Sequence, residues 1–205
     1  MTGVLCAMEK ELALLRASFG EKRVLCALSG IGKVNAALAA AALADAGAGC
    51  MLNIGVAGGL DPSLRCGDVV LCSGTAYHDV WCGEPNLPGQ VQGLPARFPA
   101  DAELLEKAVQ AIPGARCGLC ISGDRFVTDP AEAGRLHEAF PEALCLDMEA
   151  AAIAQACHLR GVPCLSVKII SDSVSDDDRT GVYEGFWETL AERSFKTIEP
   201  LLNLL

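Results

Sequence analysis

The stretch CMLNIGVA at residues 50–57 decides the expected fold, because it has the length of one strand and carries apolar side chains on both of its faces. Such a strand is typical of a central sheet that helices cover on both sides. Six further apolar runs of strand length recur along the chain, separated by segments with helical spacing. They are GVLCA (3–7), VLCAL (24–28), GDVVLCS (67–73), CGLCIS (117–122), ALCL (143–146) and PCLSVKII (163–170). The sequence therefore predicts an α/β protein.

The segments between these runs are expected to form six helices. Their approximate ranges are 9–20, 31–47, 101–111, 130–138, 149–160 and 181–203. No repeat or linker divides the 205 residues, so one domain over residues 1–205 is expected. Only residues 82–99, which are rich in Gly and Pro, interrupt the alternation, and we interpret this segment as a long excursion.

Composition excludes several classes of protein. The net charge of −10, from 16 Lys and Arg against 26 Asp and Glu, leaves no basic stripe for nucleic acid. Glu9, Lys10 and Glu11 stand where a secretory signal would need apolar residues, and no apolar run reaches the roughly 18 residues of a membrane helix. We therefore expect a cytoplasmic protein that binds neither nucleic acid nor membranes.

The chain has 11 cysteines, an odd number that argues against a fully paired disulfide framework. Eight of them lie in the apolar runs, where a free thiol acts as a small hydrophobe, and these include Cys6, Cys26, Cys72, Cys145 and Cys164. We therefore interpret the cysteines as reduced core residues. Cys117 and Cys120 have the spacing of half a zinc or redox site, but no second pair and no matching histidine pair accompanies them. Neither a metal nor a cofactor is expected.

Polar residues directly follow four of the apolar runs, at the edge of the sheet where open α/β proteins bind ligands. MEKE follows GVLCA, IGVAGG follows CMLN, DMEA follows ALCL, and SDSVSDDD follows LSVKII. Each feature alone has a simple structural explanation, because acidic residues suit the first turn of a helix and glycines or Ser-Asp pairs suit turns. Three carboxylates at the ends of three strands would nevertheless converge on one cleft if the strands are neighbours. They belong to Glu11, Glu149 and Asp172.

Eight segments follow one another in a recognisable order between Val4 and about Phe186: AMEKE, SGIGKVNAA, NIGVAGGL, GDVV, YHD, SGDRFV, LDMEAAAIA and IISD. Together they resemble the purine nucleoside phosphorylase and uridine phosphorylase superfamily, and most closely its 5′-methylthioadenosine/S-adenosylhomocysteine nucleosidase branch. The resemblance implies a three-layer α/β/α sandwich with a central mixed β-sheet, a purine nucleoside as ligand and hydrolysis of its N-glycosidic bond. It also implies a homodimer, to which we expect residues 82–99 and Trp81 to contribute by closing the neighbouring pocket.

The resemblance assigns catalytic roles to two of the carboxylates. Asp172 corresponds to the general acid that protonates or hydrogen-bonds N7 of the purine, which lets the glycosidic bond break through an oxocarbenium-like transition state. Glu11 corresponds to the residue that positions and deprotonates the attacking water.

The resemblance also implies a set of substrate-binding residues. Glu149 would accept hydrogen bonds from the ribose hydroxyls, with Met148 packed against the sugar. Phe126 would stack on the base, the main chain of Val127 would contact the base edge, and Gly58 would allow a close backbone approach. The full implied set is Ile31, Val56, Gly58, Phe126, Val127, Met148, Glu149 and Ser171.

The nucleophile decides between a hydrolase and a phosphorylase. Phosphorylases of this superfamily typically hold the anion with arginines in the first strand-to-helix loop and beside the second glycine motif. Here Glu9 and Glu11 occupy the first place and GVAGGL the second. Because carboxylates repel phosphate and suit the activation of water, hydrolysis is expected, with a phosphate-dependent phosphorylase as an alternative.

Several departures from the family pattern concern the substrate. Val56 stands where the branch usually has a serine that helps to orient the aspartate, and Lys168 replaces a usual arginine near the water. The loop VWCGEPNLP lacks the aromatics that usually enclose the 5′-alkylthio group, and the segment between Glu11 and SGIGK is shorter, as if by one β-hairpin. Futalosine hydrolase is therefore an alternative, although Asp172 is kept as in the adenine-cleaving enzymes. A nucleoside-binding protein without turnover is another, but it would not need to keep all three carboxylates.

Overall fold

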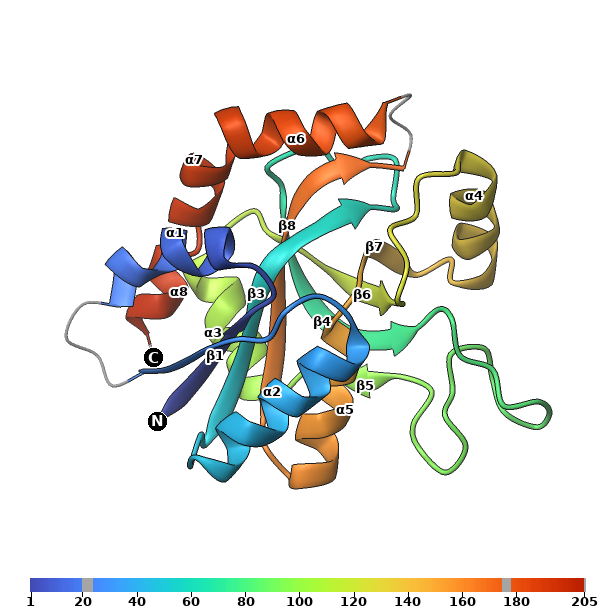
Figure 1. Ribbon diagram of the computed structural model, residues 1–205, viewed down its shortest axis with the longest axis horizontal. Coiled ribbons are helices and arrows are strands. Elements are labelled where there is room, and N and C mark those ends of the chain that lie inside the picture. The colour runs from blue at the N-terminus through green and yellow to red at the C-terminus, as the bar shows by residue number, and fades with distance from the viewer. Residues whose placement is uncertain (20–23, 175–177, 205) are drawn as a thin grey trace.

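The computed structural model describes residues 1–19, 24–174 and 178–204, and its centre is one mixed sheet of eight strands (Figure 1). Each of the seven predicted runs forms one strand. The eighth strand, β5 (Phe98–Pro99), lies in the excursion and is not predicted, because two residues carry no alternating pattern. The other strands are β1 (Thr2–Cys6), β2 (Val24–Leu28), β3 (Cys50–Gly59), β4 (Val69–Tyr77), β6 (Arg116–Ser122), β7 (Ala143–Asp147) and β8 (Cys164–Ser173).

Five of the strands pair in a closed ring, in the order β3, β8, β4, β6, β7 and back to β3. The ring closes at Gly58, which is in register with Leu146 of β7 on one side and with Asp172 of β8 on the other. β1 pairs with β3 in parallel outside the ring. This register brings together the ends of the strands that precede the predicted carboxylates.

Helices cover the sheet on both sides (Figure 1), so the predicted layering is confirmed. On one face α2 (Lys33–Asp45) packs on α5 (Ala150–Arg160), and together they bury Leu5 and Met51 of the sheet. The other face carries α1 (Glu9–Phe19), α3 (Ala102–Ala111), α6 (Arg179–Thr189), α7 (Ala191–Lys196) and α8 (Glu199–Asn203). α4 (Pro130–Ala139) packs near β6 and β7. Among the described residues, no helix is long and apolar enough to cross a membrane.

The single helix predicted over 181–203 is wrong, because this segment forms α6, α7 and α8. α6 also begins two residues earlier than expected. Pro200 lies in the first turn of α8, where its missing N–H has no cost, whereas inside a continuous helix it would remove a hydrogen bond. The breaks let Phe186, Phe195 and Leu201 all enter the same core.

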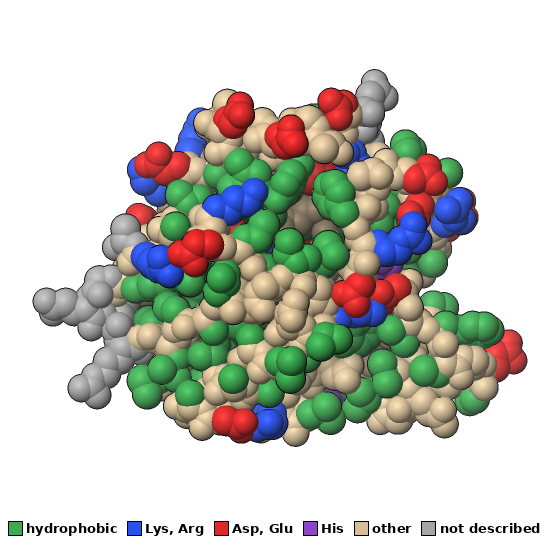
Figure 2. Space-filling view, viewed as in Figure 1, with side chains coloured by type: hydrophobic (Ala, Val, Ile, Leu, Met, Phe, Trp, Pro, Cys, Tyr) green, Lys and Arg blue, Asp and Glu red, His purple; other side chains and the backbone are tan. Residues whose placement is uncertain are grey.

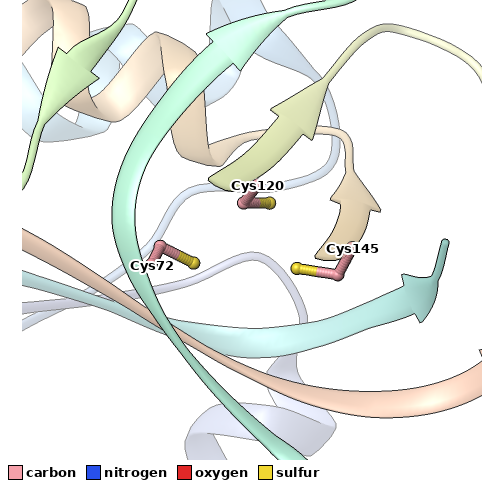
Figure 3. Close-up of side chains that lie close together, drawn as sticks. All are labelled: Cys72, Cys120 and Cys145. Atoms are coloured by element: carbon pink, nitrogen blue, oxygen red, sulfur yellow. The ribbon is translucent and has the colours of Figure 1, made fainter. Parts of the chain in front are cut away.

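The 11 cysteines all lie among the described residues, and no disulfide joins them. Cys72, Cys120 and Cys145 are fully buried on β4, β6 and β7, and their sulfurs point toward one another within 4.8 Å (Figure 3). The prediction of core positions is wrong for three cysteines, because Cys26, Cys82 and Cys117 are exposed. Cys26 is exposed because β2 is an edge strand of the sheet. Cys164 is only half-buried.

Candidate active site

A pocket of about 240 Å³ opens where the ends of β1, β3, β7 and β8 meet. In the view of Figure 2 it is the hollow below α6. The residues of the predicted set that line it are Glu11, Ile31, Val56, Gly58, Phe126, Met148, Glu149, Ser171 and Asp172. Val127, the remaining member, is buried and turns its carbonyl oxygen toward Arg179 in the pocket wall. The three carboxylates therefore share one cavity, while the roles assigned to these residues stay predictions.

Glu11 lies in the first turn of α1 and is 1% exposed. Its Oε1 accepts the N–H of Val56 at 2.9 Å, and its Oε2 accepts the N–H of Met8 at 2.8 Å. A Cβ atom at Gly55 would lie 2.7 Å from Oε1, so only glycine leaves room for this carboxylate. Burial raises the pKa of Glu11 above its ordinary value, against the lowering effect of these hydrogen bonds. A carboxylate in this state is suited to take a proton from water.

Glu149 lies at the junction of β7 and α5 and makes no side-chain cap to its own helix. Its Oε1 instead accepts the N–H of Gly32 at 2.8 Å, on the other side of the pocket. Gly30 and Gly32 have φ values of 80° and 96°, which glycine adopts without strain, and this turn aims the N–H at the carboxylate. Burial, and then repulsion by Asp147, raise the pKa of Glu149 to about 7. The helix-cap explanation therefore does not hold for Glu149.

Asp147 is the residue that caps α5. Its Oδ2 accepts the N–H of Ala150 at 2.9 Å and lies 2.8 Å from Nζ of Lys168, in an ion pair whose side chains are 1% and 2% exposed. Burial alone would lower the pKa of Lys168, but the Asp147 carboxylate raises it above its ordinary value. Burial raises the pKa of Glu11 and of Glu149, and the charged ammonium of Lys168 partly offsets this rise. Lys168 therefore acts on both pocket carboxylates while it is held by Asp147.

Asp172 lies near the end of β8 that reaches the pocket, and it is 1% exposed. The hydroxyl of Ser171 donates to its Oδ1 at 2.6 Å. Val56 offers no hydroxyl, as the sequence shows, and the hydroxyl that contacts the aspartate belongs to Ser171 instead. The other oxygen of Asp172, Oδ2, faces the pocket and contacts Arg179.

Arg179 is a pocket residue that the sequence analysis missed. Its Nε donates to Oδ2 of Asp172 at 2.7 Å, its Nη2 donates to the same oxygen, and its Nη1 donates to the carbonyl oxygen of Val127. The guanidinium carbon lies 5.6 Å from the centre of the Phe126 ring. Arg179 opens α6, where the helix dipole disfavours a cation. A basic residue in the first turn is the sequence feature that could have drawn attention to it.

Tyr183, one turn further along α6, is a second missed residue. Its ring packs edge-on against Phe126 with a centroid distance of 5.7 Å, and its hydroxyl lies 3.6 Å from Sδ of Met8. The ammonium of Lys10 lies 4.9 Å from the centre of the Tyr183 ring on the outer side. Tyr183 lies four residues after Arg179, so both side chains are on one face of α6.

Three buried cysteines are the one group of three or more metal-binding side chains that lies close together among the described residues, namely Cys72, Cys120 and Cys145. Cys117, the other cysteine of CGLC, is exposed and does not join them. Three thiolates around a monovalent or divalent cation would leave a net negative charge, and the nearest ammonium, on Lys168, is already paired with Asp147. Burying uncompensated charge costs several kcal/mol. These thiols are therefore better suited to the apolar core than to metal binding.

The family model of the phosphorylase superfamily matches residues 9–203 of this chain. The chain belongs to the phosphorylase superfamily. A relative from Tolumonas auensis, named 5′-methylthioadenosine/S-adenosylhomocysteine nucleosidase, is 35% identical, and the match covers 99% of each chain. The crystal structure of the nucleosidase of that name from Neisseria meningitidis, in complex with methylthio-immucillin-A, has a TM-score of 0.92 at 38% identity and covers 100% of this chain and 99% of its own.

Futalosine hydrolases are also members of this structural neighbourhood. The native structure of futalosine hydrolase of Helicobacter pylori has a TM-score of 0.92, and the match covers 100% of this chain and 97% of that one. Its sequence identity is 25%, against 38% for the Neisseria meningitidis nucleosidase. The fold is thus common to both kinds of enzyme, and within the superfamily this chain is more similar in sequence to the nucleosidase.

Proposed function

We propose that this member of the phosphorylase superfamily hydrolyses the N-glycosidic bond of a purine nucleoside, 5′-methylthioadenosine or S-adenosylhomocysteine, and releases adenine. The observation that carries the proposal is the grouping of Glu11, Glu149 and Asp172 in one pocket. Desolvated carboxylates are costly, and a protein that only binds a nucleoside would not need three of them. The names of the Tolumonas auensis relative and the Neisseria meningitidis structure support the same substrates.

In this reaction Asp172 acts on the leaving base. A purine anion is a poor leaving group, so a proton donated to N7 lets the C1′–N9 bond break toward a neutral base. Ser171 fixes Oδ1 of Asp172 and leaves Oδ2 as the oxygen that addresses N7. Phe126 lies against the same space and offers its ring to the face of the base.

Glu11 and Glu149 act on the water and the sugar. Glu11, with a raised pKa, takes one proton from water while the hydroxide oxygen bonds to C1′. Glu149 accepts hydrogen bonds from the ribose hydroxyls, and its own position is fixed by the N–H of Gly32. Lys168 stabilises negative charge at both carboxylates from behind the pocket. The proton lost by water and the proton gained by N7 pass through different carboxylates.

The charges of the pocket favour water over phosphate as the nucleophile. The two arginines that line the pocket are both paired, Arg179 with Asp172 and Arg125 with Glu132. A phosphate beside C1′ would lie next to the buried Glu11 carboxylate, which repels it. Electrostatic repulsion in this buried site disfavours the anion.

The 5′ end of the nucleoside would meet an apolar wall. Met8 and Tyr183 line the pocket together and contact each other. A thioether side chain and an aromatic ring offer favourable contacts to the sulfur of a 5′-alkylthio group. Tyr183 therefore compensates for the aromatics that the loop at residues 80–88 lacks.

We further propose that the protein acts as a cytoplasmic homodimer. Val34, Leu38 and Trp81 are at least 66% exposed, and in Figure 2 charged side chains are sparse over α2. Val34 and Leu38 lie four residues apart on α2, exposed apolar side chains of this kind are typical of an interface, and a dimer through α2 would cover them. Cysteines without disulfides fit a reducing compartment. Sedimentation of the wild type and of Leu38→Glu tests the dimer, and a monomeric, fully active wild type would contradict it.

The assay that tests the catalytic proposal measures release of free base from methylthioadenosine, S-adenosylhomocysteine, adenosine, inosine and futalosine, each with and without phosphate. Phosphate-independent release of adenine from the two thio-nucleosides is expected. Asp172→Asn and Glu11→Gln should each abolish hydrolysis and still bind adenine. Cleavage that requires phosphate would show a phosphorylase, and preferred cleavage of futalosine would show the alternative hydrolase.

A further inference from the structure

The guanidinium of Arg179 contacts each of the groups that the resemblance and the proposed function together assign to the purine base. It donates to the carboxylate of Asp172 and to the main-chain carbonyl of Val127, and it lies over the ring of Phe126. On the opposite side, the nearest atom to a Cβ placed on Gly58 is Nη2 of Arg179, so this glycine leaves room for the guanidinium. An acid, an edge contact, an aromatic face and a close backbone approach all converge on one planar group.

A guanidinium and an N7-protonated adenine offer similar hydrogen-bond donors. Both are flat, and both present adjacent N–H groups along one edge, in adenine the N7–H and the 6-amino group. Asp172 and Val127 supply the two acceptors that such an edge needs, one a carboxylate and the other a carbonyl. The position is therefore complementary to a planar cation with neighbouring donors, whichever molecule provides it.

Burial explains why Asp172 holds a cation. Asp172 is 1% exposed and Arg179 is 4% exposed, and a buried carboxylate without a partner is costly. The pairing also compensates Arg179 for its place in the first turn of α6, where the helix dipole opposes a positive charge. Asp178 caps the same turn by accepting the N–H of Gly181 at 3.0 Å, so the backbone that carries Arg179 is held in place.

We propose that the Arg179 side chain and the purine base are alternative occupants of this one position, so that Arg179 must leave before a base can bind. This inference rests on the proposed function, because it takes the position to be that of a base. The two cannot be present together, since Oδ2 of Asp172 and the carbonyl of Val127 are the acceptors of both. Arg179 is thus an autoinhibitory contact, and its departure frees the oxygen that addresses N7.

The consequence is a measurable penalty on base binding. The apparent Kd equals the intrinsic Kd divided by the fraction of molecules in the competent form. If Arg179 is displaced in about a tenth of the molecules or fewer, Arg179→Ala should bind adenine at least about tenfold more tightly than the wild type. Arg193→Ala, an exposed arginine of the neighbouring α7, is the matched control and should leave the Kd unchanged.

Calorimetric titration with adenine gives the first test, and guanidinium chloride gives the second. Added guanidinium at low millimolar concentration should raise the apparent Kd of Arg179→Ala for adenine, because the free ion takes the place of the missing side chain. The wild type should respond no more than it does to sodium chloride. A role of Arg179 in structure alone would not produce this competition.

The outcomes separate the two proposals. If both proteins bind adenine and Arg179→Ala binds no more tightly, the inference is overturned while the proposed function stands. If neither binds adenine, the proposed function fails and the inference with it. Crystal structures of the wild type without and with adenine decide the case should Arg179→Ala not fold. An Arg179 that stays on Asp172 in both, or is away from it in both, would overturn the inference.

Discussion

Replacing Glu149 with glutamine should change how the stability of the protein depends on pH. Burial, and then the nearby Asp147 carboxylate, raise the pKa of Glu149 from 4.5 to about 7 in the folded protein. In the unfolded chain, solvent restores the ordinary value. Between these two pH values the unfolded chain releases a proton that the folded protein keeps, so rising pH favours unfolding.

The size of the effect follows from the two pKa values. Each pKa unit is worth about 1.4 kcal/mol. The rise from 4.5 to about 7 means that the charged Glu149 costs the folded state about 3 kcal/mol above pH 7, and nothing below pH 4.5, where both states hold the proton. Glutamine keeps an oxygen that can accept the N–H of Gly32 but carries no charge. The variant should therefore lack this pH-dependent cost.

The assay is urea unfolding of the wild type and Glu149→Gln at several pH values between about 4.5 and 8. The free energy of unfolding of the variant minus that of the wild type should increase by about 3 kcal/mol across this range. Glu188→Gln, on the exposed side of α6, is the control and should give a constant difference. Parallel pH profiles for Glu149→Gln and the wild type would refute the raised pKa and the argument built on it.

Three further predictions concern activity. The value of kcat/KM should fall as the pH decreases through about 7, because protonated Glu149 is a poorer acceptor for ribose hydroxyls, and a profile that is flat down to pH 5 would contradict this. Gly55→Ala should lower kcat/KM on the order of a hundredfold, because the added Cβ would lie 2.7 Å from Oε1 of Glu11 and displace this carboxylate. Unchanged kinetics would show that Glu11 is not the group that takes a proton from water. Ser171→Ala should lower kcat about tenfold with a small change in KM, as expected for the loss of a hydrogen bond worth about 1.5 kcal/mol that orients Asp172.

The sequence predicts the central strands because they are buried on both faces and must be apolar along their whole length. β3 shows this directly, since its prediction depends on a run whose side chains are almost all buried. β5 has no such run, because it consists of two residues that pair with β4. The run at 181–203 has helical spacing throughout, but spacing does not record that the chain must turn twice to keep Phe195 and Leu201 on one core.

Some residues of the candidate site are likewise predictable from the sequence, and others are not. Glu11, Glu149 and Asp172 are predictable because each lies at or just after the end of a strand that reaches the pocket, and strand ends can be read from the sequence. Arg179 and Tyr183 come from a helix that crosses over this edge, and the face that α6 turns inward depends on the path of the chain rather than on a local pattern. Ser171 lies between these cases, since its position is predictable but its hydrogen bond to Asp172 is not.

Asp147 and Glu149 show how two residues of one short motif come to act in different places. Asp147 still belongs to β7 and is in register with Ser122 of β6, so its carboxylate turns into the strand ring toward Lys168. Glu149 has left the strand, and with φ of −135° and ψ of −37° it sits at the start of α5 and faces the pocket. The proximity has a chemical consequence, because the Asp147 charge contributes to the raised pKa of Glu149 while Lys168 opposes it. The strand-to-helix junction therefore both places Glu149 and adjusts its proton affinity.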